Sequence, residues 1–107
     1  MTKISILYPY SERSRFDMNY YLEIHMPQSI DRLSIAPGFH SVSVERGLSL
    51  TTPGSAPAYV AMCQYVFESA QHFLDAFMPQ AEFLQSDMPN YTNITPIIQV
   101  SEVEIMR

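Results

Sequence analysis

The sequence has few of the residues that build common cofactor and metal sites. Its three glycines, Gly38, Gly47 and Gly54, are isolated, which excludes a glycine-rich phosphate-binding loop. The three histidines and the single cysteine, Cys63, show no spacing typical of a metal site. We therefore expect no metal and no other cofactor.

Charged residues and long apolar runs are also scarce. Eleven acidic and six basic residues give a net charge of −5, and without a run of Lys or Arg a nucleic-acid partner is not expected. No apolar run is long enough to span a bilayer, and the N-terminal alternation, which ends by Ser11, is too short for a signal peptide. With one cysteine and no internal disulfide, the reducing cytoplasm is the expected location.

The 107 residues suit one domain covering positions 1–107, because two independent units of that total length would each have too small a core. A hydrophobic content of 47% with 16% charged residues is typical of a folded domain. So much apolar surface in a short chain favours self-association.

Hydrophobic periodicity predicts the order strand, helix, strand, strand, helix, strand. The expected strands cover residues 3–8, 39–50, 58–67 and 95–105, and the expected helices cover residues 17–33 and 70–78, with a short irregular or helical stretch at 81–87. Asp17 and Ser69 are the expected N-terminal caps. Pro27 predicts a kink in the first helix, because proline lacks the backbone donor and its ring crowds the preceding turn.

This order predicts a ferredoxin-like α+β fold, a four-stranded antiparallel sheet with both helices on one face. The strand at 58–67 is apolar on both faces, with Val60 and Met62 on one and Cys63 and Tyr65 on the other, which places it in the centre of the sheet. The sheet face without helices should then carry exposed apolar groups. A homodimer formed through that face is the expected way to cover them.

His25 is the first candidate functional residue. At 100° per residue, Asn19 and Glu23 share a polar side of the predicted helix and His25 projects away from them, inward beside Tyr21 and Leu22. Imidazole changes charge near neutral pH, so an inward histidine can act as acid, base, hydrogen-bond donor or ligand. The alternative is a histidine that is simply hydrogen-bonded within the core.

Tyrosines are the second candidate group. Four of them fall in or beside predicted core elements and could line a pocket with their hydroxyls facing a ligand. These ligand-binding candidates are Tyr8, Tyr21, Tyr59 and Tyr65. The alternative is that they only fill a small core.

Three segments of the chain resemble the EthD family, named for ethyl tert-butyl ether degradation. They are residues 16–27, with a tyrosine-rich helix before His-Met-Pro, residues 65–69, and residues 87–93, which read Asp-Met-Pro-Asn-Tyr-Thr-Asn. The resemblance spans nearly the whole chain. It implies a dimeric α+β barrel, in which two ferredoxin-like sheets pack face to face, and it makes His25 the motif histidine.

The resemblance leaves three hypotheses for function. The first is a homodimer that binds a small apolar or aromatic molecule between sheet and helices, in or beside oxidative catabolism, with His25 as acid, base or anchor. The second is an enzyme proper, a cofactor-independent oxygenase, cyclase or decarboxylase acting on a phenolic or polyketide-like substrate. The third is a non-catalytic accessory or structural dimer in which His25 is a core residue.

Overall fold

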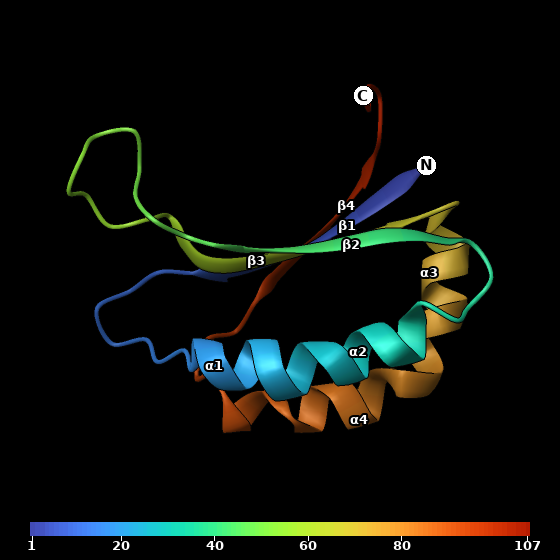
Figure 1. Cartoon of the computed structure of the whole chain (residues 1–107), viewed down its shortest axis with the longest axis horizontal. Helices are drawn as coiled ribbons and strands as arrows, with labels where there is room; N and C mark the ends of the chain where they lie inside the picture. The colour runs from blue at the N-terminus through green and yellow to red at the C-terminus, as the bar shows by residue number, and fades with distance from the viewer.

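A four-stranded antiparallel sheet forms one layer of the structure, and the helices form the other (Figure 1). The computed structural model describes residues 1–107. Its strands are β1 (Thr2–Pro9), β2 (Phe39–Arg46), β3 (Tyr59–Phe67) and β4 (Ile97–Glu102). The strand order is β2-β3-β1-β4, so β1 and β3 are central, and the ferredoxin-like fold is confirmed.

The first helix runs from Met18 to Leu33 and contains a π-helical turn. It consists of α1 (Met18–Tyr20), the π turn η1 (Tyr21–His25) and α2 (Met26–Leu33). Asp17 caps its start by accepting the backbone N–H of Tyr20 at 3.1 Å. The backbone N–H of Met26 reaches back five residues to the carbonyl of Tyr21. The disruption expected at Pro27 therefore takes the form of a π turn just before the proline.

The second helical segment changes direction at Pro79. It consists of α3 (Ala70–Phe77), the 3-10 turn η2 (Met78–Gln80), α4 (Ala81–Ser86) and a second 3-10 turn η3 (Met88–Asn90). Ser69 caps α3 by accepting the backbone N–H of His72 at 3.1 Å, as predicted. Because Pro79 cannot continue the α-helical hydrogen bonding of α3, the chain turns there and α4 runs alongside α2 (Figure 1).

Two strands are shorter than the sequence pattern predicts. β2 was expected to reach Leu50 but ends at Arg46. The next residue, Gly47, approaches the carbonyl oxygen of Tyr59 so closely that no Cβ could be accommodated. β4 was expected to cover residues 95–105, but it spans only Ile97–Glu102. Glu102 pairs with Thr2, the first residue of β1, and beyond it only one hydrogen bond continues the pairing, from the Val103 N–H to the Met1 carbonyl at 2.9 Å.

The core lies between the sheet and the helices and is rich in aromatic rings. Its largest fully buried side chains are Tyr21, Tyr65, Tyr91, Phe67, Ile4, Leu33 and Cys63. Alternation along β3 directs Cys63, Tyr65 and Phe67 toward the helices. The Cys63 thiol is free and buried there.

The open face of the sheet is more polar than expected. Ser5 on β1 pairs with Gln64 on β3, and the Ser5 hydroxyl donates a hydrogen bond to the Gln64 side chain at 2.7 Å. Val60 and Met62 lie on the same face, and Ile97 on β4 is 50% exposed there. This face therefore combines apolar groups with a hydrogen-bonded polar centre, instead of forming a continuous apolar patch.

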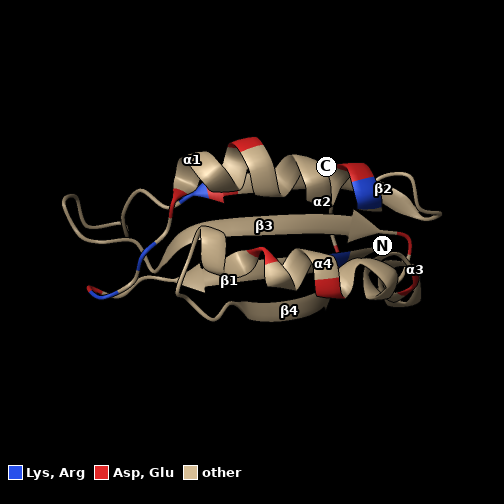
Figure 2. Ribbon diagram, turned by 90° about the horizontal axis from the view of Figure 1, so that it is seen from below, with Lys and Arg blue, Asp and Glu red and all other residues tan.

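Charged residues are scattered over the fold. Figure 2 shows the Lys and Arg residues spread over strands, helices and loops rather than gathered on one element. None of the helices is long and apolar enough to cross a membrane.

Candidate functional site

A cavity of about 420 Å³ lies between the helices and the sheet. Fourteen of its 19 lining residues are hydrophobic, so a molecule held there meets a mainly apolar surface. The apolar lining includes Met26, Leu33, Phe73, Leu84 and Ile98. The polar side-chain groups on its wall belong to four tyrosines, which count among those fourteen, and to His25, Ser29, Gln85 and Thr95.

The π turn directs His25 into this cavity. A residue in a π turn rotates less than the 100° of an α-helix, so His25 comes to lie over Tyr21, and the two rings stack at 5.6 Å with planes 12° apart. Leu22, which was expected to point inward, is instead 42% exposed, as is Ile24. The inward face of the helix is therefore centred on Tyr21 and His25, with Leu22 and Ile24 at its outer side.

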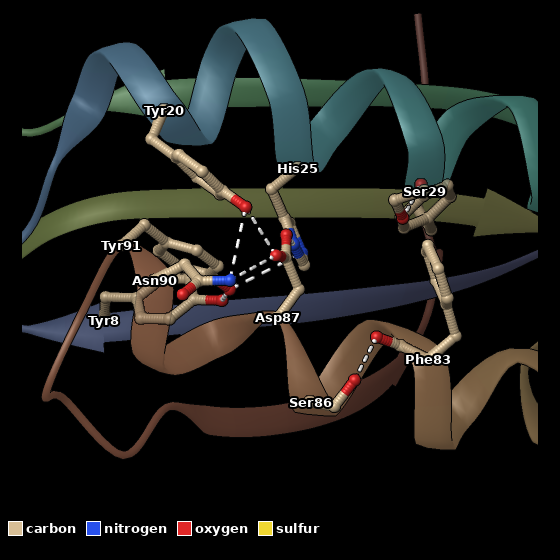
Figure 3. Close-up of polar contacts among 10 residues, drawn as sticks. Tyr8, Tyr20, His25, Ser29, Phe83, Ser86, Asp87, Asn90 and Tyr91 are labelled. Atoms are coloured by element: carbon tan, nitrogen blue, oxygen red, sulfur yellow. Dashed lines mark hydrogen bonds and ion pairs between the residues drawn. The ribbon is translucent and has the colours of Figure 1, made fainter.

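Asp87 holds the ring of His25. It lies directly after α4, and its Oδ2 is 2.9 Å from His25 Nδ1. The Tyr20 hydroxyl donates to Asp87 Oδ1 at 2.6 Å, and the Asn90 amide donates to the same oxygen at 2.9 Å (Figure 3). The carboxylate of Asp87 thus joins the first helix to the turn that follows α4.

These contacts and burial set the charges of Asp87 and His25 at neutral pH. Partial burial alone would raise the pKa of Asp87, but the hydrogen bonds from Tyr20, Asn90 and His25 bring that pKa below its ordinary value. Burial lowers the pKa of His25, and the nearby Asp87 only partly opposes this effect. Asp87 is therefore a carboxylate and His25 a neutral imidazole. Since Asp87 can only accept, His25 carries its proton on Nδ1 and its lone pair on Nε2.

Two buried tyrosines stand on the Nε2 side of the ring. The Tyr91 hydroxyl lies 3.5 Å from His25 Nε2, and the Tyr8 and Tyr91 hydroxyls are 2.9 Å apart (Figure 3). Burial raises the pKa of Tyr8 and of Tyr91, so both remain protonated. Because Nε2 can only accept, Tyr91 donates to it and Tyr8 donates to Tyr91. At 3.5 Å the bond to Nε2 is weak, which leaves the lone pair available to a closer donor.

A second polar pair lies in the same cavity. The hydroxyls of Ser29, on α2, and Tyr65, on β3, are 2.7 Å apart, and both side chains are buried. Ser29 follows His25 by one helical turn.

Four of the five sequence-predicted site residues share the cavity wall. His25, Tyr8, Tyr21 and Tyr65 line it, whereas Tyr59, at the start of β3, does not. Their roles in binding or catalysis remain predictions. The wall also contains Tyr91 and Ser29, which sequence reasoning did not assign to the site.

Asp87 was also not assigned to the site from the sequence. It is 62 positions from His25, and no local pattern brings the two together. The one available signal was the motif at residues 87–93, which carries both Asp87 and Tyr91.

The remaining histidines lie elsewhere and are engaged in other contacts. His40 Nε2 is 2.8 Å from a Glu68 carboxylate oxygen at an exposed position, and His72 Nδ1 is 2.7 Å from the Ser69 hydroxyl. The structure contains no group of three or more His, Cys, Asp or Glu side chains placed to hold a metal ion.

Several solved structures are similar to this chain. An EthD-like protein from Ralstonia eutropha is 40% identical, with 99% of this chain and 94% of that chain covered and a TM-score of 0.91. An ethyl tert-butyl ether degradation (EthD) family protein from Bacillus halodurans is 16% identical, with 96% and 98% covered and a TM-score of 0.63. A putative monooxygenase from Shewanella loihica is 10% identical, with 98% and 95% covered and a TM-score of 0.66.

The latter two similarities concern the fold alone, because their identities are low. No family model matches the sequence, and no curated protein matches it. The fold is that of the dimeric α+β barrel superfamily, as the sequence resemblance implied.

Proposed function

The chain belongs to the EthD family, and we propose that its cavity binds a small, largely apolar or aromatic molecule, in or beside oxidative catabolism. His25 would accept a proton from this molecule and return it. One observation carries the proposal. A neutral imidazole, oriented by the carboxylate of Asp87, presents a weakly occupied lone pair at Nε2 to an apolar cavity.

The proton step can be written for a ligand with an acidic hydroxyl. The ligand O–H bond breaks as an N–H bond forms at His25 Nε2, and no electrons are exchanged. The resulting imidazolium is stabilised by Asp87 at 2.9 Å, and the Tyr91 hydroxyl, released from Nε2, donates to the new oxyanion. Returning the proton restores the starting state.

This step favours the enzymatic alternative over simple carriage. A phenolate or enolate is the electron-rich species with which cofactor-independent oxygenation, cyclisation or decarboxylation of a phenolic or polyketide-like substrate begins. Carriage of a ligand requires the cavity but not a base oriented by a carboxylate, whereas His25 and Asp87 form that combination. A purely structural role would require neither the cavity nor polar groups on its wall.

Binding of 4-nitrophenol tests the proposal, because its phenolate absorbs at a longer wavelength than the neutral phenol. At a fixed, mildly acidic pH, the bound probe should contain more phenolate than the free probe. His25→Gln should retain binding but lose this phenolate fraction. His40→Gln is the matched control, since it removes an exposed histidine that pairs with Glu68, and it should behave as wild type.

Two results would count against the proposal. The first is that 4-nitrophenol does not bind to the protein. The second is that it binds with the same phenolate fraction to the wild type and to His25→Gln.

We also propose that the protein is a cytoplasmic homodimer formed through the open face of the sheet. Val60, Met62 and the half-exposed Ile97 on that face support this assembly, and the Ser5–Gln64 pair would supply polar contacts within it. The buried free thiol of Cys63 suits a reducing compartment. Sedimentation should give twice the monomer mass for the wild type and the monomer mass for Ile97→Glu. A monomeric wild type would contradict the proposed assembly.

A further inference from the structure

We propose that Ser29 and Tyr65 form a second polar subsite, which donates a hydrogen bond to a carbonyl-type oxygen of the ligand whose acidic hydroxyl meets His25. The inference rests on the proposed function and narrows its ligand class. The ligand is a small ring compound with a hydroxyl group at one end and a neutral carbonyl oxygen at the other.

A count of hydroxyl hydrogens supports the subsite. Ser29 and Tyr65 have one hydroxyl hydrogen each, and their contact at 2.7 Å uses only one of the two. Neither hydroxyl makes any other hydrogen bond in the structure. Whichever of them donates to the other, one O–H has no acceptor, although both side chains are buried. A buried donor without an acceptor is costly, and a ligand oxygen in the cavity would supply that acceptor.

The spacing of the two polar groups fits one small ligand. Ser29 lies four residues after His25, which corresponds to about 6 Å along the helix axis at 1.5 Å per residue. Both side chains line the same cavity and come from successive turns of one helix (Figure 3). A benzene ring with two oxygen-bearing groups in para positions separates its oxygens by a comparable distance.

The charge of the cavity favours a neutral acceptor. None of the 19 lining residues is Lys or Arg, so a carboxylate at the Ser29–Tyr65 end would have no cationic partner. A carbonyl oxygen accepts a hydrogen bond without requiring a counter-charge. A site built to donate to a carbonyl also discriminates against a ligand without one, because the donor then stays unpaired.

The test compares 4-hydroxyacetophenone with 4-ethylphenol, which has a similar shape but no carbonyl group. Calorimetry gives Kd for each phenol with the wild type, with Ser29→Ala/Tyr65→Phe and with His25→Gln. Tyr59→Phe is the matched control, because it removes a tyrosine hydroxyl from the same strand outside the cavity lining. Both subsite hydroxyls are removed together because either one alone can still donate.

The quantity compared is the preference, Kd for 4-ethylphenol divided by Kd for 4-hydroxyacetophenone. We expect this preference to be about tenfold larger in the wild type and in Tyr59→Phe than in the double variant, as for the loss of one buried hydrogen bond. An equal preference in the wild type and the double variant, with both phenols still bound, would overturn the subsite and leave the role of His25 intact. If neither phenol binds to the wild type, the proposed function fails and the subsite fails with it.

A second measurement needs only the wild-type protein, in case the double variant does not fold. The carbonyl stretching frequency of bound 4-hydroxyacetophenone, measured by isotope-edited infrared spectroscopy, should lie below its value in an alkane solvent, because a donated hydrogen bond weakens the C=O bond. A frequency equal to the alkane value would overturn the inference.

Discussion

Replacing Asp87 with asparagine is expected to reverse the tautomer of His25. In the wild type, His25 Nδ1–H donates to Asp87 Oδ2, while Tyr20 and Asn90 both donate to Oδ1. An asparagine of the same shape keeps its oxygen toward those two donors and turns its NH₂ group toward the ring. Nδ1 must then accept, so the proton moves to Nε2 and the lone pair that faced the cavity is lost.

The size of the electrostatic change follows from the contact geometry. Two unit charges about 4 Å apart interact by about 4 kcal/mol at an effective dielectric constant near 20. Solvent screening reduces this value, because the Asp87 side chain is 14% exposed. A remaining stabilisation of protonated His25 by Asp87 of about 1–2 kcal/mol corresponds to about one pKa unit. The pKa of His25 should therefore fall by about one unit in Asp87→Asn, and the bound 4-nitrophenol phenolate should decrease by about tenfold or more.

Two-bond proton–nitrogen correlation spectra of nitrogen-15-labelled protein distinguish the tautomers at neutral pH. The wild type should show an unprotonated Nε2 in His25, and Asp87→Asn should show an unprotonated Nδ1. His40 and His72 serve as internal controls, since neither contacts Asp87. A wild-type ring with its proton on Nε2, or the same tautomer in both proteins, would show that Asp87 does not set the tautomer of His25.

Three further predictions concern stability and reactivity. The pKa of His25 is lowered in the folded state, so as pH falls below about 6.5 the unfolded chain binds a proton that the folded chain resists, and stability decreases. In urea unfolding, the free energy of unfolding should decrease less between pH 7.5 and pH 5.5 for His25→Gln than for the wild type. Equal decreases in the two proteins would contradict this prediction. Burial raises the pKa of Cys63 to about 12, so the thiol should react with an aromatic disulfide reagent only on unfolding, and rapid reaction of the folded protein would disprove it. Leu33→Ala should lower the free energy of unfolding by about 2–5 kcal/mol, because the Leu33 side chain is only 1% exposed. Ile35 is 85% exposed, so Ile35→Ala should change the free energy of unfolding by less than about 0.5 kcal/mol. Similar effects of the two substitutions would contradict the described core.

Features encoded by neighbouring residues were predictable from the sequence. Asp17 and Ser69 cap their helices as expected, because a cap depends on residues within one turn. The two-sided apolar pattern of β3 placed that strand in the centre of the sheet, which the strand order confirms. The inward direction of His25 also followed from helical periodicity, although the π turn altered which neighbours share its face.

The contacts that define the candidate site were not predictable, because they join distant segments. Asp87 and Tyr91 are 62 and 66 positions from His25 and reach it only through the tertiary packing of the chain. By strand alternation, Tyr59 should lie on the same face of β3 as Cys63 and Tyr65. The pairing of β3 with β1 is irregular at Tyr59, however, and Tyr59 does not line the cavity. Strand alternation carries no information about such an irregularity.

A crystal structure of the protein with 4-nitrophenol bound would show whether His25 meets the acidic hydroxyl of a ligand in the cavity. We expect the probe to occupy the cavity with its phenol oxygen within hydrogen-bonding distance of both His25 Nε2 and the Tyr91 hydroxyl, while Asp87 remains hydrogen-bonded to Nδ1. A probe bound only outside the cavity, or bound inside it with its phenol oxygen away from His25, would show that His25 does not act on a ligand in this cavity.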